Sequence, residues 1–242
     1  PYSQGDDLRL VDWRLFARTD KHYMKSFENE THLECHIYLD SSSSMGFRQG
    51  GELSKLEYGS FFAACLSWLI IKGNDLVSLQ IFDESIREFI PPGSTHKHLN
   101  QLLHLLETNK PGGMTSISNA LDNSQGLLKR RGSLVIISDF LDDPARLFQS
   151  LNAYLHRGFK LILVQVLDPA ELNLPDQGAV RYKDMETGER LVLHPDRIRN
   201  EYQDNMNAHR ESLHHFAVAR GIHFSPVSTW DSYYSLFDEL AR

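Results

Sequence analysis

The side chains best suited to chemistry in this 242-residue chain are oxygen donors that follow apolar segments. The run Asp40-Ser41-Ser42-Ser43-Ser44 comes directly after the apolar segment 33–39, which we interpret as a buried strand. One carboxylate and alternating hydroxyls on a tight loop are ligands that hard cations such as Mg²⁺ prefer. The loop therefore provides part of a possible metal site, and other segments must complete it.

Two later segments supply further oxygen ligands. They are Gly112-Gly113-Met114-Thr115 and Ser138-Asp139, the second again after an apolar run. Hydroxyl ligands are neutral, so a site with few direct carboxylates leaves its cation electrophilic and ready to bind one more acidic oxygen. Mg²⁺ usually keeps several waters, and exchange of one water for a partner's carboxylate would make a metal-bridged contact. The competing interpretation is that the serine run forms only a polar turn or a helix cap.

Segments with strand and helix periodicity alternate along the chain. We expect strands at residues 33–39, 76–82, 86–90, 133–137, 159–167 and 222–225. We expect helices at residues 55–72, 97–107, 116–128, 144–156, 197–220 and 232–240. Nearly all-apolar strands alternating with helices indicate an α/β domain, a doubly wound and mostly parallel sheet flanked by helices. Such folds bind ligands at the carboxyl ends of the strands, where strand order reverses, and Asp40 and Asp139 both follow strands.

Three other features affect the organisation. Residues 1–30 are polar and charged with interspersed aromatics, and we expect an N-terminal arm that packs on the core and continues an upstream region missing here. Residues 31–242 would form the main domain. Within it, a turn with glycine at 188 predicts a β-hairpin insertion at 179–193. The run Pro91-Pro92-Gly93 should end the strand at 86–90.

The three ligand segments resemble the metal-ion-dependent adhesion site of von Willebrand factor A domains. Their order along the chain matches that family, and the resemblance covers about residues 33–167. It implies that Ser42, Ser44 and Thr115 are direct metal ligands. It also implies that Asp40 and Asp139 bind the ion directly or through water.

A narrower resemblance spans nearly the whole chain. The motifs are similar to those of domain-of-unknown-function family 58 (DUF58), a bacterial family: Gly5-Asp6-Asp7-x-Arg9-x-x-Asp12-Trp13-Arg14-x-x-Ala17-Arg18, Lys25-Ser26-Phe27-Glu28, Leu39-Asp40-x-Ser42-x-Ser44-Met45-Gly46, Ser138-Asp139-Phe140 and Leu167-Asp168-Pro169-x-Glu171. In that family an arm precedes a von Willebrand A-like domain, and members commonly occur with MoxR-type AAA+ ATPases. The resemblance implies a partner or adaptor of such an ATPase in protein maturation or remodelling.

Composition narrows the possible functions. The formal net charge of −7 argues against general nucleic-acid binding. The longest apolar stretch, residues 61–71, is too short to span a bilayer, so no membrane contact is visible in this chain. We expect a cytoplasmic protein, with a membrane anchor only if an upstream segment provides one.

These observations lead to one main hypothesis and two alternatives. The main hypothesis is a non-enzymatic protein-binding module that captures a partner's carboxylate through Mg²⁺, with Mn²⁺ or Ca²⁺ as other candidate ions. The first alternative is a metal-assisted hydrolase that uses the same cluster to activate water. The second is a vestigial, empty site, with recognition by the hairpin at 179–193 or by the arm.

Overall fold

The computed structural model describes residues 13–21, 23, 33–174, 178, 180–186, 188–232, 234, 236 and 237. The chain divides into two compact units, one up to residue 32 and one from Leu33 onward. In the first unit, helix α1 covers Trp13–Thr19. Most of the predicted arm lies outside the described residues, so its packing on the core stays a prediction.

The described residues of the second unit form a six-stranded sheet in the order β3-β2-β1-β4-β5-β8. The strands are β1 (Glu34–Asp40), β2 (Leu76–Phe82), β3 (Ile86–Gly93), β4 (Ser133–Ser138), β5 (Lys160–Leu167) and β8 (His223–Ser228). Strand β3 pairs antiparallel with β2, and the other neighbouring strands are parallel. The predicted fold class is confirmed. A separate antiparallel hairpin, β6 (Val180–Lys183) and β7 (Arg190–Leu193), confirms the predicted insertion.

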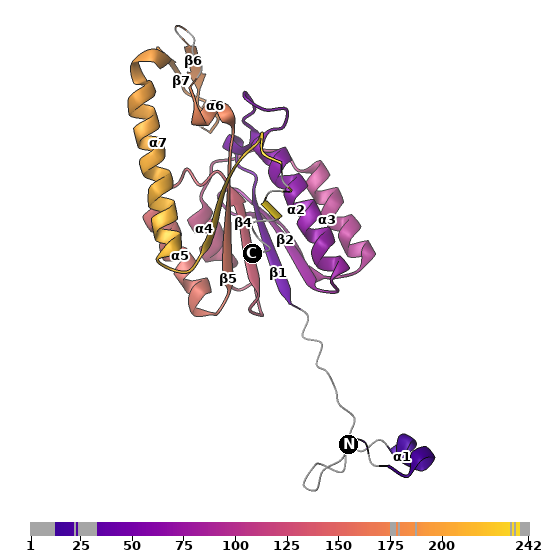
Figure 1. Cartoon of the computed structure of the whole chain (residues 1–242). Helices are drawn as coiled ribbons and strands as arrows, with labels where there is room; N and C mark the ends of the chain where they lie inside the picture. Colours follow the sequence, from indigo (N-terminus) through magenta and orange to yellow (C-terminus); the bar gives the residue numbers. More distant parts are fainter. Residues whose placement is uncertain are drawn as a thin grey trace. The chain divides into compact units, whose positions relative to one another are not determined.

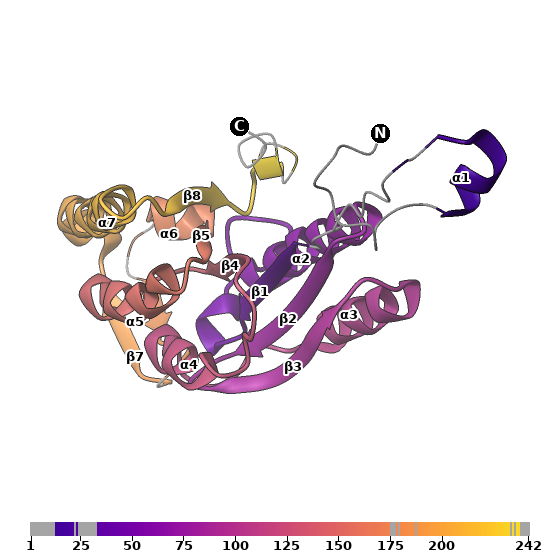
Figure 2. The ribbon, with the colours of Figure 1, turned by 90° about the horizontal axis from the view of Figure 1, so that it is seen from below.

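Helices cover both faces of the sheet (Figures 1 and 2). Helices α2 (Lys55–Lys72) and α3 (His96–Thr108) lie on one face. The other face carries α4 (Ile117–Ser124), α5 (Pro144–His156) and α7 (Pro195–Val218), and the short α6 (Pro169–Leu172) follows β5. Among the described residues, no helix combines the length and apolar character needed to cross a membrane.

The core is split between the two faces because side chains alternate along each strand. In β1, Ile37 and Leu39 pack in a cluster that includes Phe62 of α2, whereas Tyr38 packs in a cluster with Leu121 of α4. Both clusters consist of fully or nearly fully buried side chains. This double burial explains why the strands are nearly all apolar.

The structure corrects several predicted boundaries. Strand β3 continues through Pro91 to Gly93, because an edge strand pairs on one side and tolerates proline on the other. Helix α4 ends at Ser124 instead of residue 128, and α7 begins at Pro195, a residue favoured in a first helical turn. Of the helix predicted at 232–240, residues 234, 236 and 237 are helical and most others lie outside the described part.

The order of the strands determines where a site can form. Strand β1 has β2 on one side and β4 on the other. The chain therefore adds β2 and β3 on one side of β1, and later β4, β5 and β8 on the other side. This is the point at which doubly wound sheets open a crevice beyond the carboxyl ends of their strands. Asp40 ends β1 and Ser138 ends β4, so both stand at this crevice.

Candidate metal centre

Asp40 links the serine loop to the neighbouring strand. Its carboxylate is fully buried, and Oδ1 accepts a hydrogen bond of 2.9 Å from the backbone N–H of Ser42. Its Oδ2 accepts one of 2.6 Å from the hydroxyl of Ser138 at the end of β4. The loop then turns into the 3₁₀ helix η2 (Ser43–Gly46). Asp40 therefore fixes the position of the hydroxyls that follow it.

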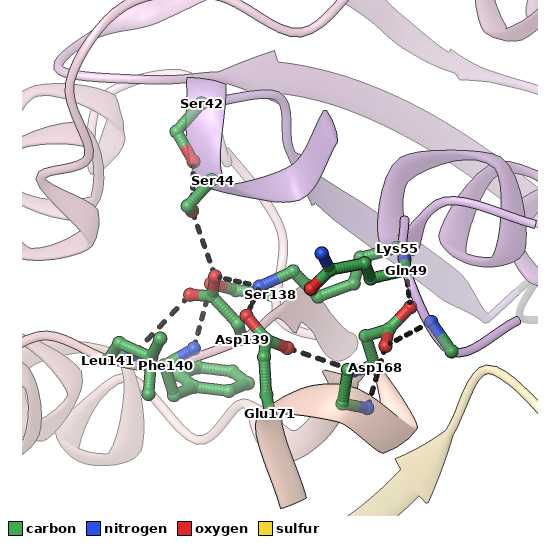
Figure 3. Close-up of polar contacts among 12 residues, drawn as sticks. Ser42, Ser44, Gln49, Lys55, Ser138, Asp139, Phe140, Leu141, Asp168 and Glu171 are labelled. Atoms are coloured by element: carbon green, nitrogen blue, oxygen red, sulfur yellow. Dashed lines mark hydrogen bonds and ion pairs between the residues drawn. The ribbon is translucent and has the colours of Figure 1, made fainter. Parts of the chain in front are cut away.

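A chain of oxygens runs from this loop to the end of β4 (Figure 3). The hydroxyl oxygens of Ser42 and Ser44 lie 3.2 Å apart. The hydroxyl of Ser44 donates a hydrogen bond of 2.8 Å to Oδ2 of Asp139. Two loops that are 95 residues apart in the sequence thus bring their oxygen donors together, as the sequence predicted.

Backbone hydrogen bonds join the segment Gly112-Gly113, which precedes Thr115, to the serine loop. The backbone N–H of Ser43 donates to the carbonyl of Gly113 at 3.0 Å, and that of Gly112 donates to the carbonyl of Ser41 at 2.9 Å. Gly113 has a φ of +82°, which L side chains rarely adopt, and a Cβ there would lie 2.8 Å from Oδ2 of Asp83. Glycine is therefore required where the chain turns towards Thr115.

Ser44, Thr115 and Asp139 line one cavity of about 280 Å³. The other lining residues are Phe47, Leu141, Asp142, Glu171, Asp184, Met185 and Glu186. The structure thus brings the predicted ligands together. Three of them line the cavity, the hydroxyl of Ser42 contacts that of Ser44, and the carboxylate of Asp40 accepts a hydrogen bond from the backbone of Ser42. Their role as metal ligands remains a prediction.

Lys55 is the residue that sequence reasoning missed. Its side chain is completely buried, and Nζ lies 2.8 Å from Oδ2 of Asp139 and 2.6 Å from Oε1 of Glu171 (Figure 3). Burial alone would lower the pKa of Lys55, but the two carboxylates outweigh burial and raise it, so the ammonium stays charged. A lysine in the first turn of a helix interacts unfavourably with the helix dipole. This unusual position is the sequence feature that could have drawn attention to Lys55.

A short helix after β5 positions the partner of this lysine. The side chain of Asp168 caps α6 by accepting a hydrogen bond from the backbone N–H of Ala170, and Oε2 of Glu171 accepts one of 2.9 Å from the backbone N–H of Asp168. The carboxylate of Asp168 also accepts hydrogen bonds from the backbone N–H groups of Gln49 and Gly50 (Figure 3). The end of β5 therefore anchors both the ion pair and the loop that precedes α2.

The backbone around Asp139 is held in an unusual conformation. Phe140 has a φ of +52°, a left-handed conformation that costs about 1–2 kcal/mol for a residue with a side chain. Three hydrogen bonds hold it: Ser138 Oγ accepts from its N–H, His209 donates to its carbonyl, and Gln165 donates to the carbonyl of Asp139. Strain that persists under such restraint is typical of functional sites.

The electrostatics of the site favour a cation. Burial first, and the charge of Asp139 second, raise the pKa of Asp40 to about 7. Lys55 forms its ion pairs with Asp139 and Glu171 and not with Asp40. Five of the ten lining residues are acidic and none is basic. One buried ammonium therefore balances only part of this negative charge, and a dication would lower the remaining repulsion.

The donor set fits a small, hard dication. Mg²⁺ binds oxygens at about 2.0–2.1 Å in an octahedron, which sets neighbouring ligand oxygens roughly 2.9 Å apart. The Ser44–Asp139 separation of 2.8 Å is close to this value, whereas the Ser42–Ser44 separation of 3.2 Å falls between it and the spacing for Ca²⁺. Octahedral Ca²⁺ would need roughly 3.3–3.7 Å. Within the described residues no cluster of three or more His, Cys, Asp or Glu side chains could hold a metal.

Solved structures with a similar fold include a von Willebrand factor A (VWA) domain. BatB from Bacteroides thetaiotaomicron matches with a TM-score of 0.60 and 18% identity, covering 86% of this chain and 97% of that one. An aerotolerance-related membrane protein from Bacteroides fragilis matches with a TM-score of 0.58 and 19% identity, covering 86% and 96%. The SpRpn10 VWA domain matches with a TM-score of 0.51 and 10% identity, covering 87% and 95%. These similarities show the fold.

Sequence comparison identifies the family. The uncharacterized protein Rv1480 of Mycobacterium tuberculosis is 30% identical over 190 residues, which cover 77% of this chain and 59% of that protein. The chain thus spans about three fifths of the length of this relative. The uncharacterized protein MAV169 of Mycobacterium avium is 34% identical over 127 residues, 50% of this chain and 74% of that protein. The model described as "Protein of unknown function DUF58" matches residues 1–212, and the chain belongs to this DUF58 family.

Proposed function

We propose that this chain is a non-enzymatic protein-binding module whose metal centre captures a carboxylate of its partner. The observation that supports this most directly is the continuous row of oxygens from Ser42 through Ser44 to Asp139. Together with Thr115, these residues would hold the ion, and Asp40 would hold it directly or through water. Mg²⁺ is the ion we propose, with Mn²⁺ as its closest substitute.

A metal bridge explains how an acidic cavity can bind an acidic partner. The lining carboxylates would repel an incoming Asp or Glu side chain at close range. A dication held there would reverse the sign of the local potential and would supply a Lewis acid for the incoming oxygen. The protein's own part is to orient hydroxyl and carboxylate oxygens, and the hydrogen bonds of Asp40 and Ser138 do this.

As the partner we propose a MoxR-type AAA+ ATPase in the cytoplasm, on the basis of the family resemblance. The experiment is a binding assay between the purified chain and the MoxR-type ATPase of the same organism, with Mg²⁺ or with EDTA. We expect binding with Mg²⁺, loss with EDTA, and loss in Asp40→Ala and Thr115→Ala while their circular dichroism is unchanged. Glu201→Ala, an exposed acid on α7, is the matched control and should bind normally.

The outcomes separate the parts of the proposal. Full, EDTA-resistant binding by both variants would remove the metal from the mechanism. Failure to bind the ATPase, with metal binding intact, would overturn the choice of partner alone. Turnover of a phosphoester or peptide that disappears in Asp139→Ala would instead establish the metal-assisted hydrolase.

A further inference from the structure

The tip of the β6–β7 hairpin reaches into the candidate metal centre. Oε1 of Glu186 accepts a hydrogen bond of 2.8 Å from the hydroxyl of Thr115 and one of 3.2 Å from its backbone N–H. The tip is itself ordered by a hydrogen bond of 2.8 Å from the N–H of Glu186 to Oδ1 of Asp184. An inserted hairpin thus delivers a carboxylate to a predicted metal ligand that is 71 residues away in the sequence.

Glu186 also shares the cavity with the other ligands. Asp184, Met185 and Glu186 line it together with Ser44 and Asp139. Among the described residues, no lysine or arginine forms an ion pair with Glu186. A dication in this cavity would therefore be a counter-ion that Glu186 could share with Asp139.

The contact with Thr115 has the geometry of a ligand position. The threonine hydroxyl gives its proton to Glu186 and keeps its lone pairs for a cation. The separation of 2.8 Å between the two oxygens is close to the roughly 2.9 Å expected between neighbouring oxygens around Mg²⁺. Glu186 therefore lies within hydrogen-bond distance of one of the predicted metal ligands, on the wall of the same cavity.

We propose that Glu186 is an internal ligand of the metal centre, which occupies the position that a partner's carboxylate takes. This inference rests on the proposed metal-dependent function and adds a regulation to it. The hairpin then competes with the partner, and binding requires the hairpin tip to move away.

The hairpin is only weakly attached to the rest of the domain. Its two strands pair with each other and form a sheet separate from the six-stranded sheet. Leu191 and Val192 of β7 are 58% and 59% exposed, so few apolar contacts hold this strand. A lone two-stranded hairpin is only marginally stable. Figure 1 shows it beyond the carboxyl end of the sheet, next to α6 and the start of α7.

The test uses Mn²⁺ as the ion and acetate as the carboxylate. Water-proton relaxation of the Mn²⁺-loaded chain reports how many exchangeable waters the ion keeps, and its change on titration with acetate reports acetate binding. The variants are Glu186→Ala and, as a milder change, Glu186→Asp, which shortens the side chain by one methylene. Glu201→Ala on α7 is the matched control.

We expect Glu186→Ala to gain one exchangeable water and to bind acetate about tenfold more tightly, as it should if the hairpin covers the site in roughly nine molecules of ten. Glu186→Asp should fall between the wild type and Glu186→Ala, and the control should equal the wild type. Normal Mn²⁺ binding with unchanged hydration and acetate affinity would overturn this inference and leave the proposed function standing. Absence of Mn²⁺ binding in the wild type would overturn both.

Discussion

The ammonium of Lys55 and the hydroxyl of Ser44 bind the same oxygen, Oδ2 of Asp139, at 2.8 Å each. The Asp139 carboxylate, which we propose as a metal ligand, therefore already forms an ion pair with the ammonium of Lys55. This arrangement pairs the buried carboxylate with a cation, and both Ser44 and Asp139 still line the cavity. Lys55 thus provides a counter-ion for this buried carboxylate that does not depend on the proposed metal.

Replacement of this lysine tests its structural role. Lys55→Met leaves Asp139 and Glu171 buried without their cation, and we expect the free energy of unfolding to fall by roughly 3–5 kcal/mol. Millimolar Mg²⁺ should restore part of the loss by compensating Asp139. Urea denaturation with and without Mg²⁺ measures both effects. Lys72→Met, an exposed lysine of the same helix, should cost less than about 1 kcal/mol. Equal losses in the two variants would contradict this account.

Adjacent glycines provide a matched pair for the loop that holds Thr115. Gly113→Ala must adopt a φ of +82° and crowd Asp83, so we expect a loss of roughly 1–3 kcal/mol in stability and weaker Mn²⁺ binding. Gly112→Ala meets no atom within 4 Å and should change little. Thermal unfolding and Mn²⁺ calorimetry compare the two. If Gly112→Ala were the more damaging, the described loop conformation would be wrong.

Serine-to-alanine substitutions test the proposed ligand set without changing the charge of the protein. Ser44→Ala removes the oxygen between Ser42 and Asp139, and we expect Mn²⁺ affinity to fall at least tenfold, or about 1.4 kcal/mol. Ser43→Ala removes a neighbouring hydroxyl that the ligand set does not include, and it should bind Mn²⁺ normally. Isothermal titration calorimetry gives both affinities. A normal affinity in Ser44→Ala would exclude this hydroxyl as a ligand.

Histidine 36 makes stability depend on pH. Burial, aided by the charge of Arg157, lowers the pKa of His36 to about 4, while a hydrogen bond with the backbone of Arg130 opposes this shift. Below pH 6.5 the unfolded chain binds a proton that the folded chain excludes, so stability falls from about pH 6.5 to pH 4.

We expect His36 to contribute roughly 1–3 kcal/mol to that fall. The free energy of unfolding, measured in urea at intervals between pH 4 and 7, gives the slope for the wild type and for His36→Gln. The variant should have the shallower slope, whatever its overall stability. Parallel slopes would show that His36 does not cause the dependence.

The sequence predicts most of the framework because the rules involved are local or topological. Apolar runs identify the strands, and the alternation of strands with helices places Asp40 and Asp139 at one edge of a parallel sheet. The glycine pair before Thr115 likewise indicates a tight turn. Such features follow from residue type and order alone.

The missed features depend on tertiary contacts. Helical periodicity places Lys55 in a first turn but cannot show that Glu171, 116 residues later, meets it in the interior. Glu186 lies in a predicted hairpin, and nothing in that pattern fixes where the hairpin tip lies. The segment 86–90 is expected as an edge strand and the strand order places it there, but the prolines that were expected to end it lie within β3, because an edge strand tolerates them.

The most direct measurement is a crystal structure of the chain grown with Mn²⁺, using anomalous scattering to locate the ion. We predict one strong anomalous peak within about 2.3 Å of Ser42 Oγ, Ser44 Oγ and an oxygen of Thr115 or Asp139. A map with no peak among these residues at saturating Mn²⁺ would contradict the account, as would an ion bound only elsewhere on the molecule.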